Sequence, residues 1–129
     1  MSQAPVLLNV IELLGYPNQR LLYERLGYKV FTEFSVRKAI SLMRKEKPAV
    51  IVADFYFQLD FRDRVSNLES LLATAQSLKD VKVVVLYDAQ HEHALERLKQ
   101  RFRIDWALIL PVKESEIEAA LSPSLTPPK

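Results

Sequence analysis

Two hydrophobic periods alternate along this chain, and their alternation restricts the possible folds more than any other feature. Short apolar runs rich in branched residues are typical of buried strands, and longer segments with apolar residues three and four positions apart are typical of helices. Strict alternation of the two predicts a parallel sheet with right-handed crossovers. The predicted strands are residues 6–11, 28–34, 49–53, 81–87 and 106–110, and a helix is expected after each of them.

Local signals indicate where the helices begin and end. The first helix should end at Gly27, because glycine adopts the left-handed conformation beyond a helix end most readily. Ser35 and Asp88 are expected to cap the second and fourth helices, and Ser66 with Glu69 forms a capping-box pair for the third. The expected inward-facing residues are Val36, Ala39, Ile40 and Met43, then Leu68, Leu71, Leu72 and Ala75, then Ala94, Leu95 and Leu98, and finally Ile117, Ala120 and Leu121.

Length and composition fit one α/β domain. The chain has 129 residues, of which 49% are apolar and 26% charged, and this balance is typical of a globular protein with one core. For five alternating units, the expected architecture is a flavodoxin-like three-layer sandwich with strand order 2-1-3-4-5. Gly15 and Gly27 are the only glycines, so a glycine-rich phosphate loop is excluded. We assign residues 1–121 to this domain and residues 122–129 to a flexible tail or linker stub.

Several classes of function are excluded by composition. A net charge of +2 does not indicate a nucleic-acid binder, and no apolar stretch approaches the roughly 20 residues that span a bilayer. The absence of cysteine excludes disulfides, thiol chemistry and thiolate metal sites. His91 and His93 stand two positions apart, which a helix directs to different sides, so no shared metal is expected. We expect a cytoplasmic protein that binds neither nucleic acid nor membrane.

Asp54 is the first candidate for a chemical centre. It ends the apolar run 49–53, and a carboxylate beside so much hydrophobic surface is expected at the water-facing end of the strand. In parallel α/β sheets, function gathers outside the carboxyl ends of the strands, where Asp54 should lie. The alternative is an acid that caps a loop or binds water.

The segments around Asp54 resemble a known family. Residues 26–55 resemble the second strand, second helix and third strand of bacterial response-regulator receiver domains, including the aspartate at the end of the third strand. Residues 81–98 resemble the fourth strand and helix of these domains, and residues 106–121 resemble the fifth strand, a proline and the last helix. The resemblance implies that Asp54 is the phosphoacceptor. It also implies Mg²⁺ bound by an acidic pair after the first strand, with a Ser or Thr after the fourth and a lysine after the fifth.

This chain departs from the receiver pattern at three of the four site components. The acidic pair falls near Val10 and Ile11, where Glu12 is the nearest carboxylate. The Ser/Thr position holds Tyr87, and the lysine position before Pro111 holds Leu110. One carboxylate binds Mg²⁺ weakly, and leucine supplies no cation to an acyl phosphate. No catalytic residue, resident metal or cofactor is therefore expected.

Aromatic residues after Asp54 indicate a different role. A contiguous apolar patch on a surface loop usually marks a partner-binding site, unless the rings fold back over the strand ends. Trp106 is a further candidate by analogy with the partner face of receivers. The loop candidates for partner binding are Phe55, Tyr56, Phe57 and Phe61, with Leu59 among them.

Three hypotheses follow. The first is a degenerate receiver, a non-enzymatic signalling module of the phosphorelay type that binds another protein or itself as a homodimer, without normal Mg²⁺-dependent phosphorylation. The second is a phosphorylatable receiver that uses Asp54, with Glu12 or Asp88 holding Mg²⁺. The third is a flavodoxin-like protein that binds a small ligand at the strand ends. The chain offers the third no Ser–His–Asp set and no metal quartet.

Overall fold

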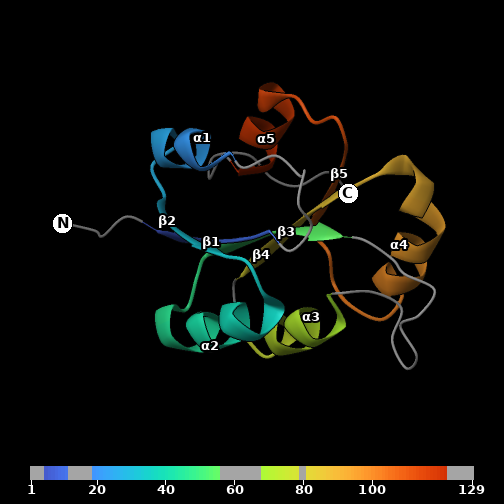
Figure 1. Cartoon of the computed structure of the whole chain (residues 1–129), viewed down its shortest axis with the longest axis horizontal. Helices are drawn as coiled ribbons and strands as arrows, with labels where there is room; N and C mark the ends of the chain where they lie inside the picture. Colours follow the sequence, from blue (N-terminus) through green and yellow to red (C-terminus); the bar gives the residue numbers. More distant parts are fainter. Residues whose placement is uncertain (1–4, 12–18, 56–67, 79–80, 122–129) are drawn as a thin grey trace.

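A five-stranded parallel sheet forms the centre of the molecule (Figure 1). The computed structural model describes residues 5–11, 19–55, 68–78 and 81–121. The strand order is β2-β1-β3-β4-β5, so the predicted order 2-1-3-4-5 and the α/β class are confirmed. The strands are β1 (Val6–Val10), β2 (Lys29–Glu33), β3 (Val50–Phe55), β4 (Lys82–Tyr87) and β5 (Trp106–Ile109).

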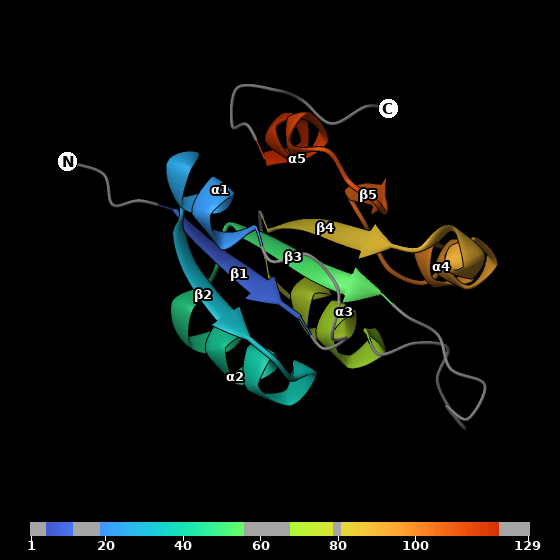
Figure 2. The same cartoon turned by 45° about the horizontal axis from the view of Figure 1, so that its top comes forward.

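Helices cover both faces of this sheet, which gives the predicted three layers. Helices α1 and α5 lie on one face, and α2 and α3 lie on the other (Figure 1). Figure 2 shows β2 with α2 at one edge of the sheet and β5 at the opposite edge. The helices are α1 (Arg20–Arg25), α2 (Val36–Glu46), α3 (Glu69–Gln76), the short 3-10 helix η1 (Ala89–His91), α4 (Glu92–Lys99) and α5 (Glu114–Leu121).

The sheet separates two apolar cores, and alternate residues of each strand enter one or the other. In β3, for example, Ile51 and Ala53 face the core beneath α2, α3 and α4, while Val50 and Val52 face the core beneath α1 and α5. All six residues of β3 are buried, which explains the continuous apolar run in the sequence. The predicted inward residues of α4 and α5 are all buried, as are Ala39 and Met43 of α2.

Most of the predicted helix ends are confirmed. Gly27 follows α1 with a positive φ of 103°, and the Ser35 hydroxyl accepts a hydrogen bond from the Lys38 backbone N–H at 3.1 Å. Asp88 caps η1, which directly precedes α4. The third helix is the exception: its N-cap is Leu68, which provides no side-chain cap. Its predicted cap, Ser66, lies outside the described residues.

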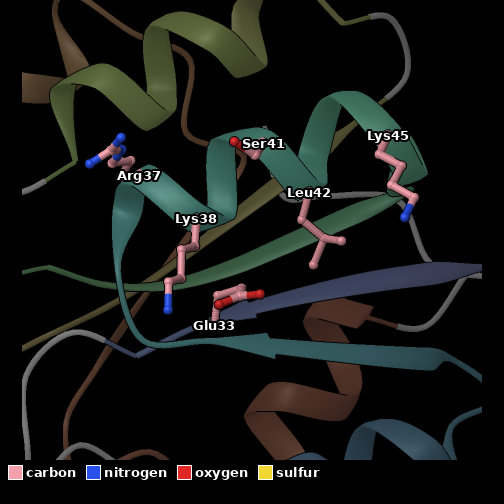
Figure 3. Close-up of a pocket in the computed structure, with 6 residues that line it drawn as sticks. All are labelled: Glu33, Arg37, Lys38, Ser41, Leu42 and Lys45. Carbon is pink, nitrogen blue, oxygen red and sulfur yellow. The ribbon is translucent and has the colours of Figure 1, made fainter.

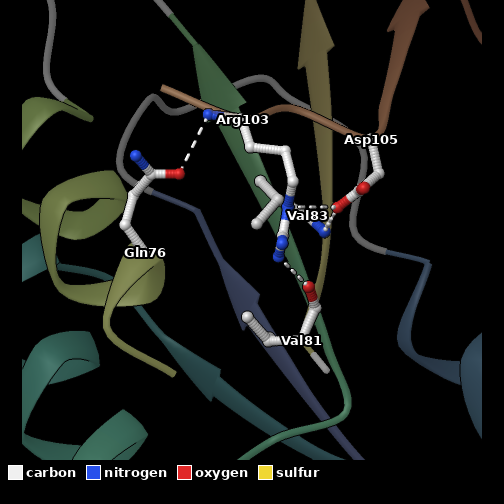
Figure 4. A network of polar contacts seen from close by, with 5 residues as sticks. All are labelled: Gln76, Val81, Val83, Arg103 and Asp105. Carbon is white, nitrogen blue, oxygen red and sulfur yellow. Dashed lines mark hydrogen bonds and ion pairs between the residues drawn. The ribbon is translucent and has the colours of Figure 1, made fainter. Parts of the chain in front are cut away.

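Polar side chains connect the elements at the amino ends of β4 and β5 (Figure 4). The Asp105 carboxylate accepts a hydrogen bond from the Val83 backbone N–H at 2.8 Å and lies 3.5 Å from the Arg103 guanidinium. Arg103 also donates to the backbone carbonyl of Val81 through its side chain and to the Gln76 side chain through its backbone N–H. The chain entering β5 is thus fixed to β4 and to the end of α3.

Two further hydrogen bonds connect this end of the sheet to α5. The Lys82 ammonium donates to the backbone carbonyl of Ala120 at 2.9 Å, and the Tyr28 hydroxyl donates to that of Leu121 at 2.6 Å. Both carbonyls belong to the last turn of α5, whose carbonyl groups lack partners within the helix. Among the described residues, no helix is long and apolar enough to cross a membrane.

Candidate functional site

The carboxyl ends of the strands bring the predicted site residues to one edge of the sheet. Asp54 is the second-to-last residue of β3 and lies opposite Leu86 of β4 in the parallel register. Tyr87, the next residue of β4, accepts a hydrogen bond at its backbone carbonyl from the Leu110 N–H at 2.8 Å. These residues therefore lie at the edge of the sheet where the sequence predicts a site, and the chemistry available there depends on which side chains face Asp54.

Strand register determines which residue of β4 shares a face with Asp54. Side chains alternate between the two faces of a sheet, and residues directly opposite each other point the same way. Leu86 is opposite Asp54 and belongs to the core beneath α1 and α5, whereas Tyr87 is opposite Phe55 and packs against the core beneath α2, α3 and α4. The sequence assigns the Ser/Thr position to Tyr87. In the structure, Leu86 is the β4 residue directly opposite Asp54, and Tyr87 is the next residue along.

Strand β1 supplies the positions at which receivers carry an acidic pair. Val10 is opposite Ala53, so Ile11 comes level with Asp54 one residue further along. Ile11 is buried and donates its backbone N–H to the Glu33 carbonyl at 2.9 Å. Both positions hold hydrocarbon side chains, as the sequence implies, and Glu12 lies outside the described residues.

Asp54 itself is buried. Its side chain is 2% exposed, which corrects the expectation that it lies at a water-facing strand end. Asp54 stands one residue before the end of β3, where β4 continues alongside it and the chain leaving β1 passes through the buried Ile11. Across the described part of the sheet, Asp54 is flanked by Ile11 on one side and Leu86 on the other, and Leu110 follows β5 on the same edge. None of these three can coordinate a cation or donate a side-chain hydrogen bond.

Tyr87 lies at the same edge but on the other face. It is half-buried, and burial raises the pKa of its phenol above the usual value of 10.0, with further increases from the charges of Glu92 and Glu96. The group therefore stays neutral at physiological pH. Leu110 is half-buried against the core beneath α1 and α5, and Pro111 after it is exposed and joined to it by a cis peptide bond.

Phe55 is not an exposed anchor. Its side chain is 0% exposed and lies in the core beneath α2, α3 and α4, where its ring meets that of His91 edge-on at a centroid distance of 6.2 Å. The proposed partner-binding role of Phe55 is therefore wrong, because strand alternation directs its ring inward. The other loop candidates, Tyr56, Phe57, Leu59 and Phe61, lie outside the described residues.

Trp106 remains a candidate for partner binding, and its side chain packs against the core. The residue begins β5, is half-buried and packs against the core beneath α1 and α5. Its indole Nε1 is enclosed and has no hydrogen-bond partner among the described residues. The large apolar side chains that are exposed in the described part of the chain are others, namely Leu21, Phe34 and Ile109.

The described residues also give little support for a metal centre. No group of three or more histidine, aspartate or glutamate side chains within the described ranges could hold a metal ion. Asp88, the alternative magnesium ligand, accepts a hydrogen bond from the Gln90 backbone N–H at 3.1 Å as the cap of η1. Glu12, the other alternative, is outside these ranges.

Two hollows beside α2 are features that the sequence does not predict. The first has a volume of about 330 Å³ and lies between α2 and the end of β2. Figure 3 shows Lys38 and Leu42 extending from α2 toward β2, with Glu33 beneath them. The second, of about 540 Å³, shares Arg37 and Ser41 with the first. The corresponding signal in the sequence is the run of basic residues within 37–47.

Comparison with known proteins identifies the fold. No protein-family model and no curated protein sequence matches the chain. Among solved structures, the signal receiver domain of an HD domain-containing protein from Pseudomonas fluorescens Pf-5 has a TM-score of 0.73 at 16% identity, with 92% of each chain covered. The receiver domain of NtrX from Brucella abortus has a TM-score of 0.69 at 17% identity, with 92% of this chain and 99% of that chain covered.

A third structure includes a modified aspartate. It is a response regulator from Burkholderia pseudomallei with a phosphorylated aspartic acid, a calcium ion and citrate, with a TM-score of 0.57 at 20% identity. The alignment covers 91% of this chain and 66% of that chain. The resemblance seen in the sequence is thus reproduced in three dimensions over nearly the whole chain. The protein has the flavodoxin-like fold of response-regulator receiver domains.

Proposed function

We propose that this chain is a degenerate receiver, a signalling module that acts by binding other proteins without magnesium-dependent phosphorylation of Asp54. Its fold is that of domains from two-component signalling proteins. One observation carries the proposal: Leu86 of β4 stands opposite Asp54, and Ile11 directly follows the β1 residue that is opposite Ala53. The scaffold of a receiver is present, and the groups that would make it a phosphoryl acceptor are replaced by hydrocarbon.

The described residues do not fit Mg²⁺. This ion requires nearly octahedral oxygen coordination and gives up its water reluctantly, so protein sites usually supply one or two well-placed carboxylates in addition to the substrate oxygens. Here Asp54 is the single carboxylate at its level among the described strands, and it is buried. The cation that would neutralise the transferred phosphoryl group is also replaced, because Leu110 stands at the lysine position.

The proposed activity is binding, and we propose no catalytic reaction or resident cofactor. The two histidines stand together at the start of α4, away from any serine or aspartate arranged for nucleophilic catalysis in the described residues. The proposed partner is a protein, either another signalling component or a second copy of the chain. A chain without cysteine fits the reducing cytoplasm, which is where we propose that the module works.

The alternative is a receiver that is phosphorylated on Asp54 with an unusual site. The Burkholderia pseudomallei structure, which contains a phosphorylated aspartic acid and a calcium ion, favours this alternative because its fold is the same. The alternative needs a second carboxylate for the metal. Asp88 is already engaged as a helix cap, which leaves Glu12 as the remaining source.

Intact-mass spectrometry separates the two proposals. The chain is incubated with MgCl₂ and acetyl phosphate, beside the Asp54→Asn and Asp88→Asn variants. We expect no gain of a phosphoryl group in any of the three, and no change in Trp106 fluorescence when Mg²⁺ and beryllofluoride are added together. A phosphoryl group that is gained by the wild type and by Asp88→Asn, and lost in Asp54→Asn, would establish the alternative and refute the degenerate receiver.

A further inference from the structure

The surface of α2 carries cations without carboxylate partners. Five basic residues of α2 and its C-cap are exposed, and none of them forms an ion pair within the described parts of the chain: Arg37, Lys38, Arg44, Lys45 and Lys47. We call these five residues the α2 basic face. Elsewhere in the described residues, five cations are paired with carboxylates at 3.0 to 3.5 Å, namely Arg20, Arg25, Lys99, Arg101 and Arg103. Lys29, Lys82 and Lys113 are cations outside α2 for which no such pair is found among these residues.

The sequence of α2 provides one carboxylate, Glu46 at its last position, against the five cations. Residues three and four positions apart are neighbours on a helix, and the neighbours of Arg37 at these spacings are Ile40 and Ser41. Arg37 and Lys38 also occupy the first helical turn, which contains no acidic residue. The positive end of the helix dipole disfavours cations there, although it favours those of the last turn. Charge placement in the first turn thus opposes helix stability, which indicates a role outside folding.

Hollows with apolar linings accompany these cations. Leu42 lines the hollow between α2 and β2, and Val36 and Ile40 line the second hollow on α2. Arg37 lines both hollows, while Lys45 lines the first and Arg44 the second. Each hollow therefore combines cations with aliphatic surface. The three aliphatic residues are partly buried and also pack against the core beneath α2, α3 and α4.

An exposed aromatic side chain extends the same region. Phe34 follows β2 directly, immediately before the Ser35 cap of α2, and its side chain is 64% exposed. Strand β2 is an edge strand of the sheet. Large aromatic side chains that remain in water at the rim of a charged surface are typical anchors for a protein partner.

We propose that the α2 basic face, with its two hollows and Phe34, binds an acidic segment of a protein partner that also carries apolar side chains. Carboxylates of the segment would neutralise the five cations, and its apolar side chains would enter the hollows. Complementary charge of this kind mainly sets the association rate and selects the partner. The inference deepens the proposed function, because it assigns a surface and a partner chemistry to a module proposed to act by binding.

Other occupants fit this surface less well. Glu33 lines the first hollow and Glu46 belongs to the same helix, so a continuous nucleic-acid backbone would meet two carboxylates. A second copy of the chain could offer its acidic helix α5. However, Glu114 is paired with Arg25 at 3.3 Å, and Glu116 accepts a hydrogen bond from the Lys113 backbone N–H at 2.9 Å. These carboxylates are already engaged within the molecule.

Fluorescence anisotropy with a labelled peptide tests the inference. The probe is a peptide of four Glu-Glu-Leu repeats, titrated with the whole chain. The test variant combines Arg37→Gln, Arg44→Gln and Lys45→Gln, and the control combines Arg20→Gln, Lys99→Gln and Lys113→Gln, which removes the same charge from other surfaces. Glutamine has a helix propensity close to that of arginine and lysine, so both variants should keep the fold, as circular dichroism would verify.

We expect the test variant to bind the peptide at least about tenfold more weakly than wild type, and the control variant to bind within about twofold. Raising NaCl from about 0.05 to about 0.5 M should weaken wild-type binding strongly, because surface charges are screened. The inference is overturned if the peptide does not bind, or if both variants lose affinity equally. It is also overturned if single-stranded DNA binds as tightly as the peptide, or if the loss follows dissociation of a dimer.

The peptide experiment and the phosphorylation experiment test the two proposals independently. A chain that does not bind the peptide and gains no phosphoryl group contradicts the α2 inference and leaves the degenerate receiver in place. A chain that is phosphorylated on Asp54 contradicts the degenerate receiver whatever the peptide does.

Discussion

Hydrogen bonds hold the amino ends of β4 and β5, whereas at the carboxyl ends of β3 and β4 the described strand residues beside the buried Asp54 carry hydrocarbon side chains. At the amino ends, Asp105 and Arg103 bind the backbone of β4 and its preceding residue. At the carboxyl ends, Asp54 is flanked by Ile11 and Leu86. The same sheet is thus polar where it is anchored and apolar where related folds place their ligands.

This difference distinguishes the residues that maintain the fold from the residues at the position where such folds carry their function. In parallel α/β sheets, ligands bind outside the carboxyl ends of the strands, where loops and helix N-termini converge. Here the strand order and both cores are formed although Ile11, Leu86 and Leu110 stand at that end. Among the described residues, charged side chains without ion-pair partners are found on α2, at an edge of the sheet. The fold therefore does not depend on polar side chains at these three positions.

Deleting the Phe55 ring should produce the largest effect and tests the apolar end directly. Phe55→Ala removes a fully buried aromatic side chain, so we expect it to lower the free energy of unfolding by about 3–5 kcal/mol in urea titrations. The matched control is Phe34→Ala, which removes the same ring from an exposed position and should change stability by no more than about 0.5 kcal/mol. Equal effects of the two substitutions would contradict the burial of Phe55.

Most of the fold could be predicted from the sequence because it depends on periodicity. Alternating strand and helix patterns specify the strand order, and the apolar run of β3 predicts a strand buried on both faces. The third helix shows the limit of this approach. Ser66 and Glu69 have capping-box spacing, yet the N-cap is Leu68, so α3 begins later than this pair predicts.

The candidate site was less predictable because it depends on register. A shift of one residue moves a side chain to the other face of the sheet, and the sequence does not fix the pairing of β3 with β4 at that precision. The sequence places Tyr87 at the Ser/Thr position, and the structure adds that Leu86 lies directly opposite Asp54 while Tyr87 lies opposite Phe55. The burial of Phe55 follows from the same alternation. The unpaired state of the α2 cations could not be predicted, since it depends on which carboxylates approach from other elements.

Removing the Asp105 carboxylate tests the polar end and should have an intermediate effect. In Asp105→Ala, the buried Val83 N–H loses its acceptor, so we expect a loss of about 1–3 kcal/mol in the free energy of unfolding. Asp105→Asn keeps an acceptor oxygen and should recover most of this loss. Glu96→Ala breaks an exposed ion pair with Lys99 and should cost no more than about 0.5 kcal/mol. An Asp105→Ala cost as small as that of Glu96→Ala would show that the amino end does not rely on this bond.

The pKa of Tyr87 is the most sensitive test of how apolar the carboxyl end of β4 is. Its effect on stability should be the smallest of those predicted. Burial raises the pKa of this phenol above 10.0, with smaller increases from Glu92 and Glu96. The folded chain therefore holds the proton more tightly than the unfolded chain. The stability that Tyr87 contributes is fully present below pH 10.0 and is lost as the pH rises through its raised pKa. Difference absorbance titration of wild type against Tyr87→Phe measures this pKa.

Two glutamate variants separate the causes of that shift. Glu92→Gln should lower the pKa of Tyr87 while leaving it above 10.0, because burial is the larger cause. Glu118→Gln, on an exposed position of α5, should leave it unchanged. If Glu92→Gln returned the pKa to 10.0, charge would dominate and the environment of Tyr87 would be far wetter than the packing around it implies. The environment of Tyr87 would then be polar. The contrast between polar amino ends and apolar carboxyl ends of the strands would not hold at this residue.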